Sequence, residues 1–300
     1  MYFDDATLQD LALGKGRAQK VARQFLSLLG TPFAQNKSVQ LGPQADFIGL
    51  VHDVSSCLQK GFVSLTPRPS LVVKSTEMLR EALDTNSLTP AQASKIRGTL
   101  GFVFTGCFGK VGRAGFGPLV QREYSDSSPF SLSHKLQRSL MFLLDLVHMA
   151  PSRQMPVSQV TRRPLYIASD ARLDERSMAV LVYDPEDQSR RSFCSQLSST
   201  LIERWAVQEQ YIALVELSAP VSFMFHCPRM IKARDIVWFI DNSAALASLV
   251  KGGSSSSDMD RGAAAVHLAL AGSQTRIWFE YIESKSNWSE SASRSLFSDE

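Results

Sequence analysis

The chain has 300 residues, of which 44% are hydrophobic and 20% are charged, and its formal net charge is +3. This is enough chain for about two domains that each bury a core. No apolar run approaches the roughly 20 residues of a membrane span, and the first residues do not follow a signal-peptide pattern. A cytoplasmic or nuclear protein without a membrane partner is therefore expected. The four cysteines form no CxxC pair, which argues against a zinc site or a disulfide framework.

The elements expected in the first half are mostly helices. Apolar residues at helical spacing predict a helix over residues 8–29, and residues 39–54 predict two short strands around a turn. Further helices are predicted over 68–83, from Pro90 onward with Thr89 as N-cap, and over 130–149. The three prolines between residues 151 and 164 predict a domain boundary.

The second half changes to a mixed α/β order. Strands are predicted over 165–169, 178–183, 192–197, 235–240 and 275–282. Helices are predicted over 200–225, with an interruption near Pro220, and over 244–250 and 261–271 on either side of a Gly/Ser loop.

The charge is divided unevenly between the two halves. Residues 1–160 carry 17 Lys and Arg against 11 Asp and Glu, a balance of +6, whereas residues 161–300 carry 15 against 18, a balance of −3. Within residues 95–122 there are five cations and no acid: Lys95, Arg97, Lys110, Arg113 and Arg122. This stretch is either a nucleic-acid-binding surface or a solvated basic face.

Four carboxylates in the second half are candidate metal ligands. Asp170 and Asp241 each follow an apolar strand, Glu216 lies in the helix before the Asp241 strand, and Glu290 follows the last strand. Carboxylates that converge repel one another unless divalent cations neutralise them, and an oxygen-only ligand set suits Mg²⁺. Two alternatives remain: Asp170 and Asp241 could be helix N-caps, and Glu209, seven residues before Glu216 on nearly the same helical face, could be the ligand instead.

These residues resemble the ribonuclease H domain of retroelement reverse transcriptases. The resemblance rests on the strings YIASDA (166–171), IALVELSA (212–219), VWFIDNSA (237–244) and NWSESASR (287–294). The last string resembles the NPADxxSR tail of DIRS-type and long-terminal-repeat retrotransposons. It departs from that tail where Trp288 replaces proline and Glu290 replaces aspartate.

The first half resembles the same family. Residues 2–5 (YFDD) are similar to the catalytic turn of the polymerase palm, residues 45–49 to the primer-grip strand, and residues 88–101 to a thumb or connection helix. The resemblance implies an α/β protein with a truncated palm remnant (1–60), a helical thumb or connection region (61–150) and a ribonuclease H-like domain with a mixed sheet (165–300). Asp4 and Asp5 would be remnants of the polymerase metal site, whose activity would be lost by truncation.

The resemblance also implies an activity. It is Mg²⁺-dependent hydrolysis of the RNA strand of an RNA/DNA hybrid, with Asp170, Glu216, Asp241 and Glu290 as catalytic residues that hold two metal ions. Mn²⁺ would be a substitute metal, and the hybrid would lie across the basic stretch. Two alternatives are a decayed or domesticated module that binds nucleic acid without cleaving it, and another two-metal nuclease of the same fold, such as an exonuclease.

Overall fold

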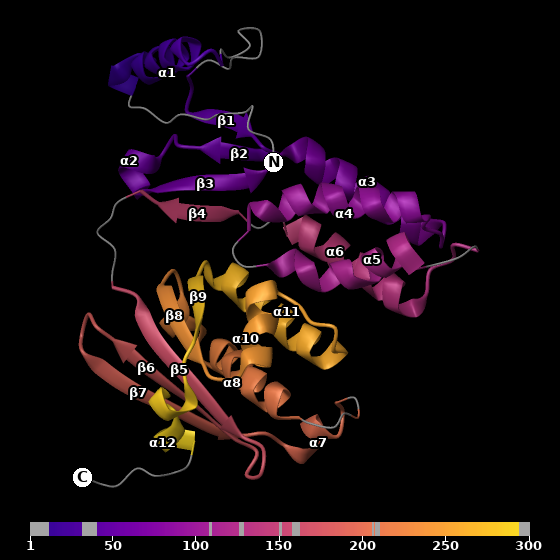
Figure 1. Ribbon diagram of the computed structural model, residues 1–300. Helices are drawn as coiled ribbons and strands as arrows, with labels where there is room; N and C mark the ends of the chain where they lie inside the picture. Colours follow the sequence, from indigo (N-terminus) through magenta and orange to yellow (C-terminus); the bar gives the residue numbers. More distant parts are fainter. Residues whose placement is uncertain are drawn as a thin grey trace.

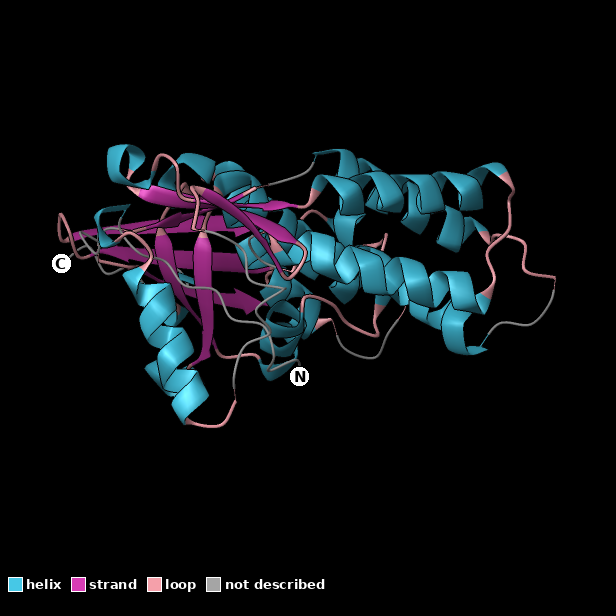
Figure 2. Ribbon diagram, turned by 90° about the horizontal axis from the view of Figure 1, so that it is seen from above, coloured by secondary structure: helices cyan, strands magenta, loops and turns pink. Residues whose placement is uncertain are grey.

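The computed structural model describes residues 12–31, 41–107, 110–125, 129–149, 152–157, 163–205, 207 and 211–293. Asp4 and Asp5 of the predicted palm turn, and Glu209, lie outside the described residues. The chain has long helices at one end and most of its strands at the other (Figure 2). No helix in the described ranges is long and apolar enough to cross a membrane.

The N-terminal part contains a four-stranded antiparallel sheet, which follows η1 (Ala12–Gly14) and helix α1 (Arg17–Leu28). Its strands in spatial order are β1 (Gln44–Phe47), β2 (Leu50–Asp53), β3 (Phe62–Pro67) and β4 (Arg153–Pro156), and α2 (Cys57–Lys60) lies between β2 and β3. Ile48 and Gly49 both have positive φ, 47° and 76°, and form the two-residue turn of the β1–β2 hairpin. The prediction of two strands in this region is confirmed, but β3 and β4 were missed. β4 lies inside the proline-rich stretch that predicts a domain boundary, and it pairs with β3 across more than 80 residues of chain, so local patterning does not reveal it.

A helical region follows the first three strands. It comprises α3 (Pro69–Asp84), α4 (Pro90–Thr105), η3 (Val111–Gly115), α5 (Phe116–Ser125) and α6 (His134–Met149). Leu79, Leu100 and Leu143 are fully buried in its core. Thr89 caps α4 as predicted, because its side chain accepts a hydrogen bond from the Gln92 amide while the Gln92 side chain accepts one from the Thr89 amide. The three predicted helices are confirmed here.

The second half contains a five-stranded mixed sheet. Its strands are β5 (Leu165–Arg172), β6 (Ser177–Asp184), β7 (Ser189–Gln196), β8 (Asp235–Ile240) and β9 (Arg276–Tyr281), in the spatial order β7-β6-β5-β8-β9. The pairs β5/β6 and β6/β7 are antiparallel, whereas β5/β8 and β8/β9 are parallel. All five predicted strands are confirmed. The first one is longer than predicted, because antiparallel pairing with β6 continues past Asp170 to Arg172.

Helices cover this sheet unequally (Figure 1). The helices of this half are α7 (Ser199–Ile202), α8 (Ile212–His226), α9 (Pro228–Ile231), α10 (Ser243–Lys251), α11 (Ser257–Ser273) and α12 (Glu290–Ser293), with η4 (Ser284–Ser286) before α12. One face packs against α8, α10 and α11 around the fully buried Trp238 and Ile167. The short α12 contacts β5, β6 and β7 on the other face.

The predicted helix over residues 200–225 is two helices, and the break is not near Pro220. It lies between α7 and α8, and Pro220 is inside α8. A proline in a helix removes one backbone hydrogen bond and costs about 3 kcal/mol. Pro220 is buried among the apolar residues of α8, and this packing offsets the lost bond.

Candidate metal centre

Two carboxylates come from adjacent parallel strands. The β5/β8 register pairs Ser169 with Ile240, so Asp170 and Asp241 occupy the next positions on neighbouring strands. Asp170 is 8% exposed and lies within β5, opposite Ala179 of β6. The alternative interpretation of both residues as N-caps is wrong. Asp170 is in mid-strand, and the helix after Asp241 is capped by Asn242, whose side chain accepts from the amides of Ala244 and Ala245 at 3.1 and 3.0 Å.

The third carboxylate, Glu216, comes from the helix that packs against β5. The Ala171 amide donates to Glu216 Oε1 at 3.3 Å, which holds the side chain against the strand. Asp170, Glu216 and Asp241 each offer an oxygen atom, and these atoms all lie within 4.8 Å of one another. Three residues separated by up to 71 positions in the sequence therefore form one acidic cluster.

The electrostatics of Glu216 favour a bound cation. Burial, followed by the charges of Asp241 and Asp170, raises the pKa of Glu216 to about 9. Its Oε2 atom is buried and has no hydrogen-bond partner among the described residues. A buried oxygen without a donor is costly, and so is a cluster of three acids. A divalent cation removes both costs, so these residues fit a metal ion.

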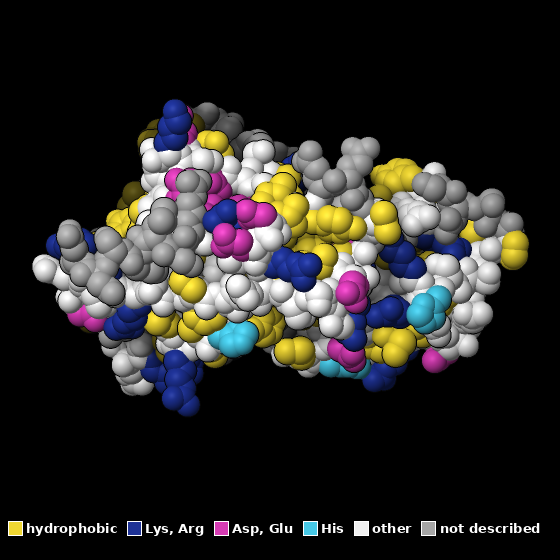
Figure 3. Space-filling view, turned by 90° about the horizontal axis from the view of Figure 1, so that it is seen from below, with side chains coloured by type: hydrophobic (Ala, Val, Ile, Leu, Met, Phe, Trp, Pro, Cys, Tyr) yellow, Lys and Arg dark blue, Asp and Glu magenta, His cyan; other side chains and the backbone are white. Residues whose placement is uncertain are grey.

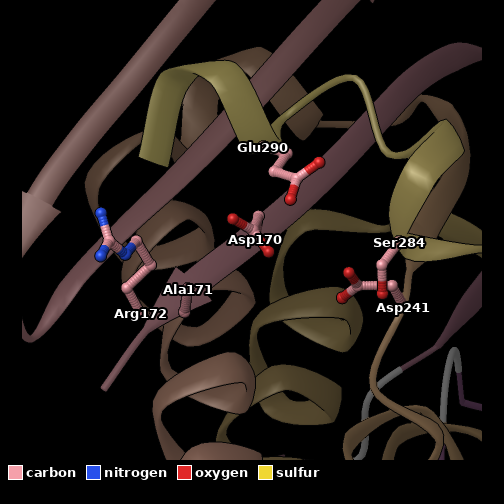
Figure 4. A pocket seen from close by; sticks show the side chains of 6 residues that line it. All are labelled: Asp170, Ala171, Arg172, Asp241, Ser284 and Glu290. Atoms are coloured by element: carbon pink, nitrogen blue, oxygen red, sulfur yellow. The ribbon is translucent and has the colours of Figure 1, made fainter. Parts of the chain in front are cut away.

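Glu290 lines a pocket together with Asp170 and Asp241 but lies outside the cluster of three acids. The pocket has a volume of about 310 Å³, and its lining residues are Asp170, Ala171, Arg172, Asp241, Ser284 and Glu290. Figure 4 shows the Asp170 carboxylate below that of Glu290 and to the left of that of Asp241, with the Arg172 guanidinium directed away from them. Arg172 instead forms ion pairs with Asp174 and Glu175 at 2.6 and 3.0 Å.

The C-terminal segment holds the pocket together through polar residues that the sequence did not single out. Ser293 of α12 donates a hydrogen bond to Asp170 Oδ2. Asn287 is 4% exposed, and its side-chain amide donates to the Ser169 carbonyl at 3.1 Å while its oxygen accepts from Ser289 Oγ at 2.5 Å. Both residues lie in the string that carries Glu290, and they match the Asn and Ser of the NPADxxSR tail, a signal that could have indicated them.

The five predicted nucleic-acid-binding cations do not share one role. Lys95 and Arg113 are exposed, whereas Arg97 forms an ion pair with Glu123 at 2.9 Å. Lys110 Nζ donates to the Val250 carbonyl. Arg122 is 3% exposed and donates to the carbonyls of Leu88 and Ser131 at 3.0 and 2.6 Å. A guanidinium buried in this way joins two loops, and the nucleic-acid-binding role of Arg122 stays a prediction.

The charged surface near the pocket differs from that of the helical half. Seen from below, acidic side chains gather around a basic one at the end of the second sheet (Figure 3). Over the helical half, basic and acidic side chains are interspersed on this face.

Comparison with protein-family models gives no match, and comparison with curated proteins gives none either. Among solved structures, the chain is similar to ribonuclease H1 from the halophilic archaeon Halobacterium salinarum NRC-1. The identity is 11% and the TM-score 0.31, and the match covers 43% of this chain and 91% of that one. This similarity is low. The three carboxylates form an acidic cluster, compatible with a divalent metal, in a mixed α/β protein.

Proposed function

We propose that the protein is a Mg²⁺-dependent nuclease that hydrolyses the RNA strand of RNA/DNA hybrids. The observation that supports this most directly is the convergence of Asp170, Glu216 and Asp241, with a buried Glu216 oxygen that has no donor within the described residues. An all-oxygen ligand set favours Mg²⁺ over zinc.

Some residues of the site would bind the metal ions, and others position the residues that do. Asp170, Glu216 and Asp241 would hold two divalent cations, with Glu290 at the border of the pocket as a further acid. When bound, such ions activate water and stabilise the charge that develops on a phosphodiester. Ser293 and Asn287 keep Asp170 and its strand in place, so that the carboxylates need not reorganise as the reaction proceeds.

The choice of substrate and the lineage rest on the resemblance to retroelement ribonuclease H domains. The strings that carry it contain the three converging acids and the two residues that anchor the C-terminal segment. The origin from a reverse transcriptase, with a palm remnant and a thumb or connection region, belongs to the same proposal. The cations of the basic stretch stay candidates for contact with the hybrid backbone, and Lys95, Lys110 and Arg113 are the exposed ones among them.

The proposal is tested by cleavage of a labelled hybrid. In Mg²⁺ the wild-type protein should cut the RNA strand internally, and Asp241→Asn should leave the hybrid intact. Asp145→Asn, an exposed acid on α6, is the matched control and should cleave like wild type. Equal products from wild type and Asp241→Asn would contradict the catalytic assignment.

Two further measurements distinguish the proposed endonuclease from an exonuclease and from a binding module. A closed circular substrate with an internal RNA stretch would be cut by the proposed endonuclease and spared by an exonuclease. Tight hybrid binding without cleavage in either Mg²⁺ or Mn²⁺ would instead indicate a binding module that no longer catalyses hydrolysis.

A further inference from the structure

The face of the second sheet opposite α8 carries a line of aromatic residues. Directly paired positions cross all five strands, and side chains at such positions point to the same face. The residues at these paired positions, from β9 to β7, are Trp278, Val237, Tyr166, Tyr183 and Arg190, and three of the five are aromatic. Their neighbours Leu165 and Ile167 point to the opposite face and are 1% and 0% exposed. We name Trp278, Tyr166, Tyr183 and the adjacent Trp288 the aromatic row.

Part of the aromatic row borders a hollow. The rings of Tyr166 and Tyr183 are stacked, with centroids 6.5 Å apart and planes 28° apart. These two residues line a pocket of about 430 Å³ together with Leu181, Val182, Arg190, Arg191 and Trp288. Trp288 is 37% exposed and Trp278 is 66% exposed. Such large aromatic surface is costly to leave in water, so these rings are available to stack against a ligand.

Trp288 is fixed in place by the segment that also supports the metal centre. The preceding residue, Asn287, is buried and bonded to the Ser169 carbonyl. The following residue, Ser289, is fully buried and bonded to Asn287. An exposed ring between two anchored residues is held ready and loses little conformational freedom when a ligand binds.

The charges at the edge of the pocket select the ligand. Arg190 on the edge strand β7 is exposed and pairs directly with Tyr183, so it shares the face of the aromatic row, whereas its neighbour Arg191 pairs with the buried Val182 of the opposite face. Exposed rings next to an arginine suit a chain that offers flat bases and phosphates alternately. A duplex keeps its bases stacked on one another and cannot offer their faces to the rings. The chemistry therefore fits an unpaired strand.

The aromatic row lies on the same face of the sheet as Asp170. Tyr166 and Asp170 are four residues apart on β5, so their side chains point to the same face, roughly 13 Å apart at about 3.3 Å per residue. Ala168 between them is fully buried, so the row is a surface separate from the carboxylate pocket.

We propose that the aromatic row, with Arg190, binds single-stranded nucleic acid. Bases stack on Tyr166, Tyr183 and Trp288, and a phosphate contacts Arg190. This goes beyond the proposed hydrolysis of a hybrid, because it concerns an unpaired strand and needs no metal ion.

The test is a binding titration of the full chain in EDTA, so that no cleavage occurs. Fluorescence anisotropy would be measured with labelled single strands of about 12 nucleotides, one of RNA and one of DNA. Binding of either strand supports the proposal. Tyr166→Leu, Tyr183→Leu and Trp288→Leu should each weaken binding about tenfold or more, the loss expected for one stacked base. Tyr124→Leu, which removes a ring 73% exposed in the helical half, should bind like wild type.

Arg190→Gln provides a second test if a tyrosine variant fails to fold, because Arg190 is exposed and its substitution leaves the core intact. It should weaken binding and reduce the slope of log affinity against log salt by about 0.7. Three outcomes would each overturn the proposal. The wild type does not bind the single strand, the variants of the aromatic row bind it as tightly as Tyr124→Leu does, or the protein binds a proline-rich peptide in place of an oligonucleotide. Asp241→Asn should still bind the single strand, so failure of the nuclease proposal and failure of this one give different results.

Discussion

At the scale of single residues, the sequence indicated the acids but not their supports. Asp170 and Asp241 could be proposed because each follows an apolar run that predicts a strand, and Glu216 because it lies in the predicted helix before the Asp241 strand. Ser293 could not be assigned from the sequence, because its hydrogen bond to Asp170 spans 123 residues. The buried Glu216 Oε2 and the raised pKa of that residue also depend on packing and not on pattern.

The position of Glu290 predicts that its substitution lowers the cleavage rate less than substitution of Asp241 does. Glu290→Gln should lower kcat for hybrid cleavage about 10- to 100-fold, the range for residues that support metal ligands. Asp241→Asn should have the larger effect, since Asp241 belongs to the converging set and Glu290 does not. Glu283→Gln, an exposed acid on the same segment, is the matched control. Steady-state kinetics in saturating Mg²⁺ would measure this, and equal losses for Glu290→Gln and Asp241→Asn would place Glu290 among the ligands.

The buried guanidinium of Arg122 predicts an effect on stability. Arg122→Met keeps most of the aliphatic stem but leaves the Leu88 and Ser131 carbonyls without this donor. The free energy of unfolding should fall by about 2 to 3 kcal/mol. Arg113→Met, at an exposed position, should change it by less than about 0.5 kcal/mol. Urea denaturation would compare them, and equal stability of the two variants would contradict the structural role of Arg122.

At the scale of elements, local signals predicted where most helices and strands lie but not how far they extend. The apolar run before Asp170 ends there, whereas β5 continues to Arg172 because β6 pairs with it. Pro220 predicts an interruption by its chemistry, yet burial in α8 overrides it. Both differences come from packing against a partner element. The helix predicted over residues 8–29 differs for a local reason, because it begins at Arg17 after Lys15 and Gly16, which have positive φ.

Helix α4 shows a local signal that does decide a boundary. Thr89→Ala removes the side-chain half of the capping box with Gln92 and should cost about 1 kcal/mol of stability. Thr105→Ala, at the other end of the same helix, removes a hydroxyl that bonds only to the Gly101 carbonyl and should cost less. Thermal and urea denaturation of both variants would measure the difference. A Thr89→Ala protein as stable as Thr105→Ala would show that the cap does not hold the helix.

At the scale of the whole molecule, the two halves meet at a buried histidine. His267 of α11 accepts a hydrogen bond from the Lys110 amide on Nδ1 at 3.1 Å, and its Nε2 bonds to the Leu249 carbonyl at 2.8 Å. Gln154 of β4 and Gln274 make a second contact, 3.2 Å from the Gln154 amide to the Gln274 side-chain oxygen. The composition of the sequence predicted two parts. It did not predict these contacts, which join residues more than 100 positions apart. The division at 1–60, 61–150 and 165–300 and its assignment to palm and thumb remain proposals.

The His267 contact predicts a pH dependence of stability. Burial lowers the pKa of His267, the charge of Lys110 lowers it further, and the bond to Leu249 partly opposes this. The unfolded chain takes up a proton below about pH 6.5, whereas the folded protein resists it. The stability from this site is therefore complete above that pH and is lost as the pH falls.

The free energy of unfolding should thus decrease between about pH 7.5 and about pH 5, and His267→Gln should remove part of that decrease. His134→Gln, at an exposed position at the start of α6, should keep the wild-type dependence. Urea denaturation across this range would measure both variants. If the stability of His267→Gln fell as steeply with pH as that of wild type, the contact between the halves would not be the source of the pH dependence.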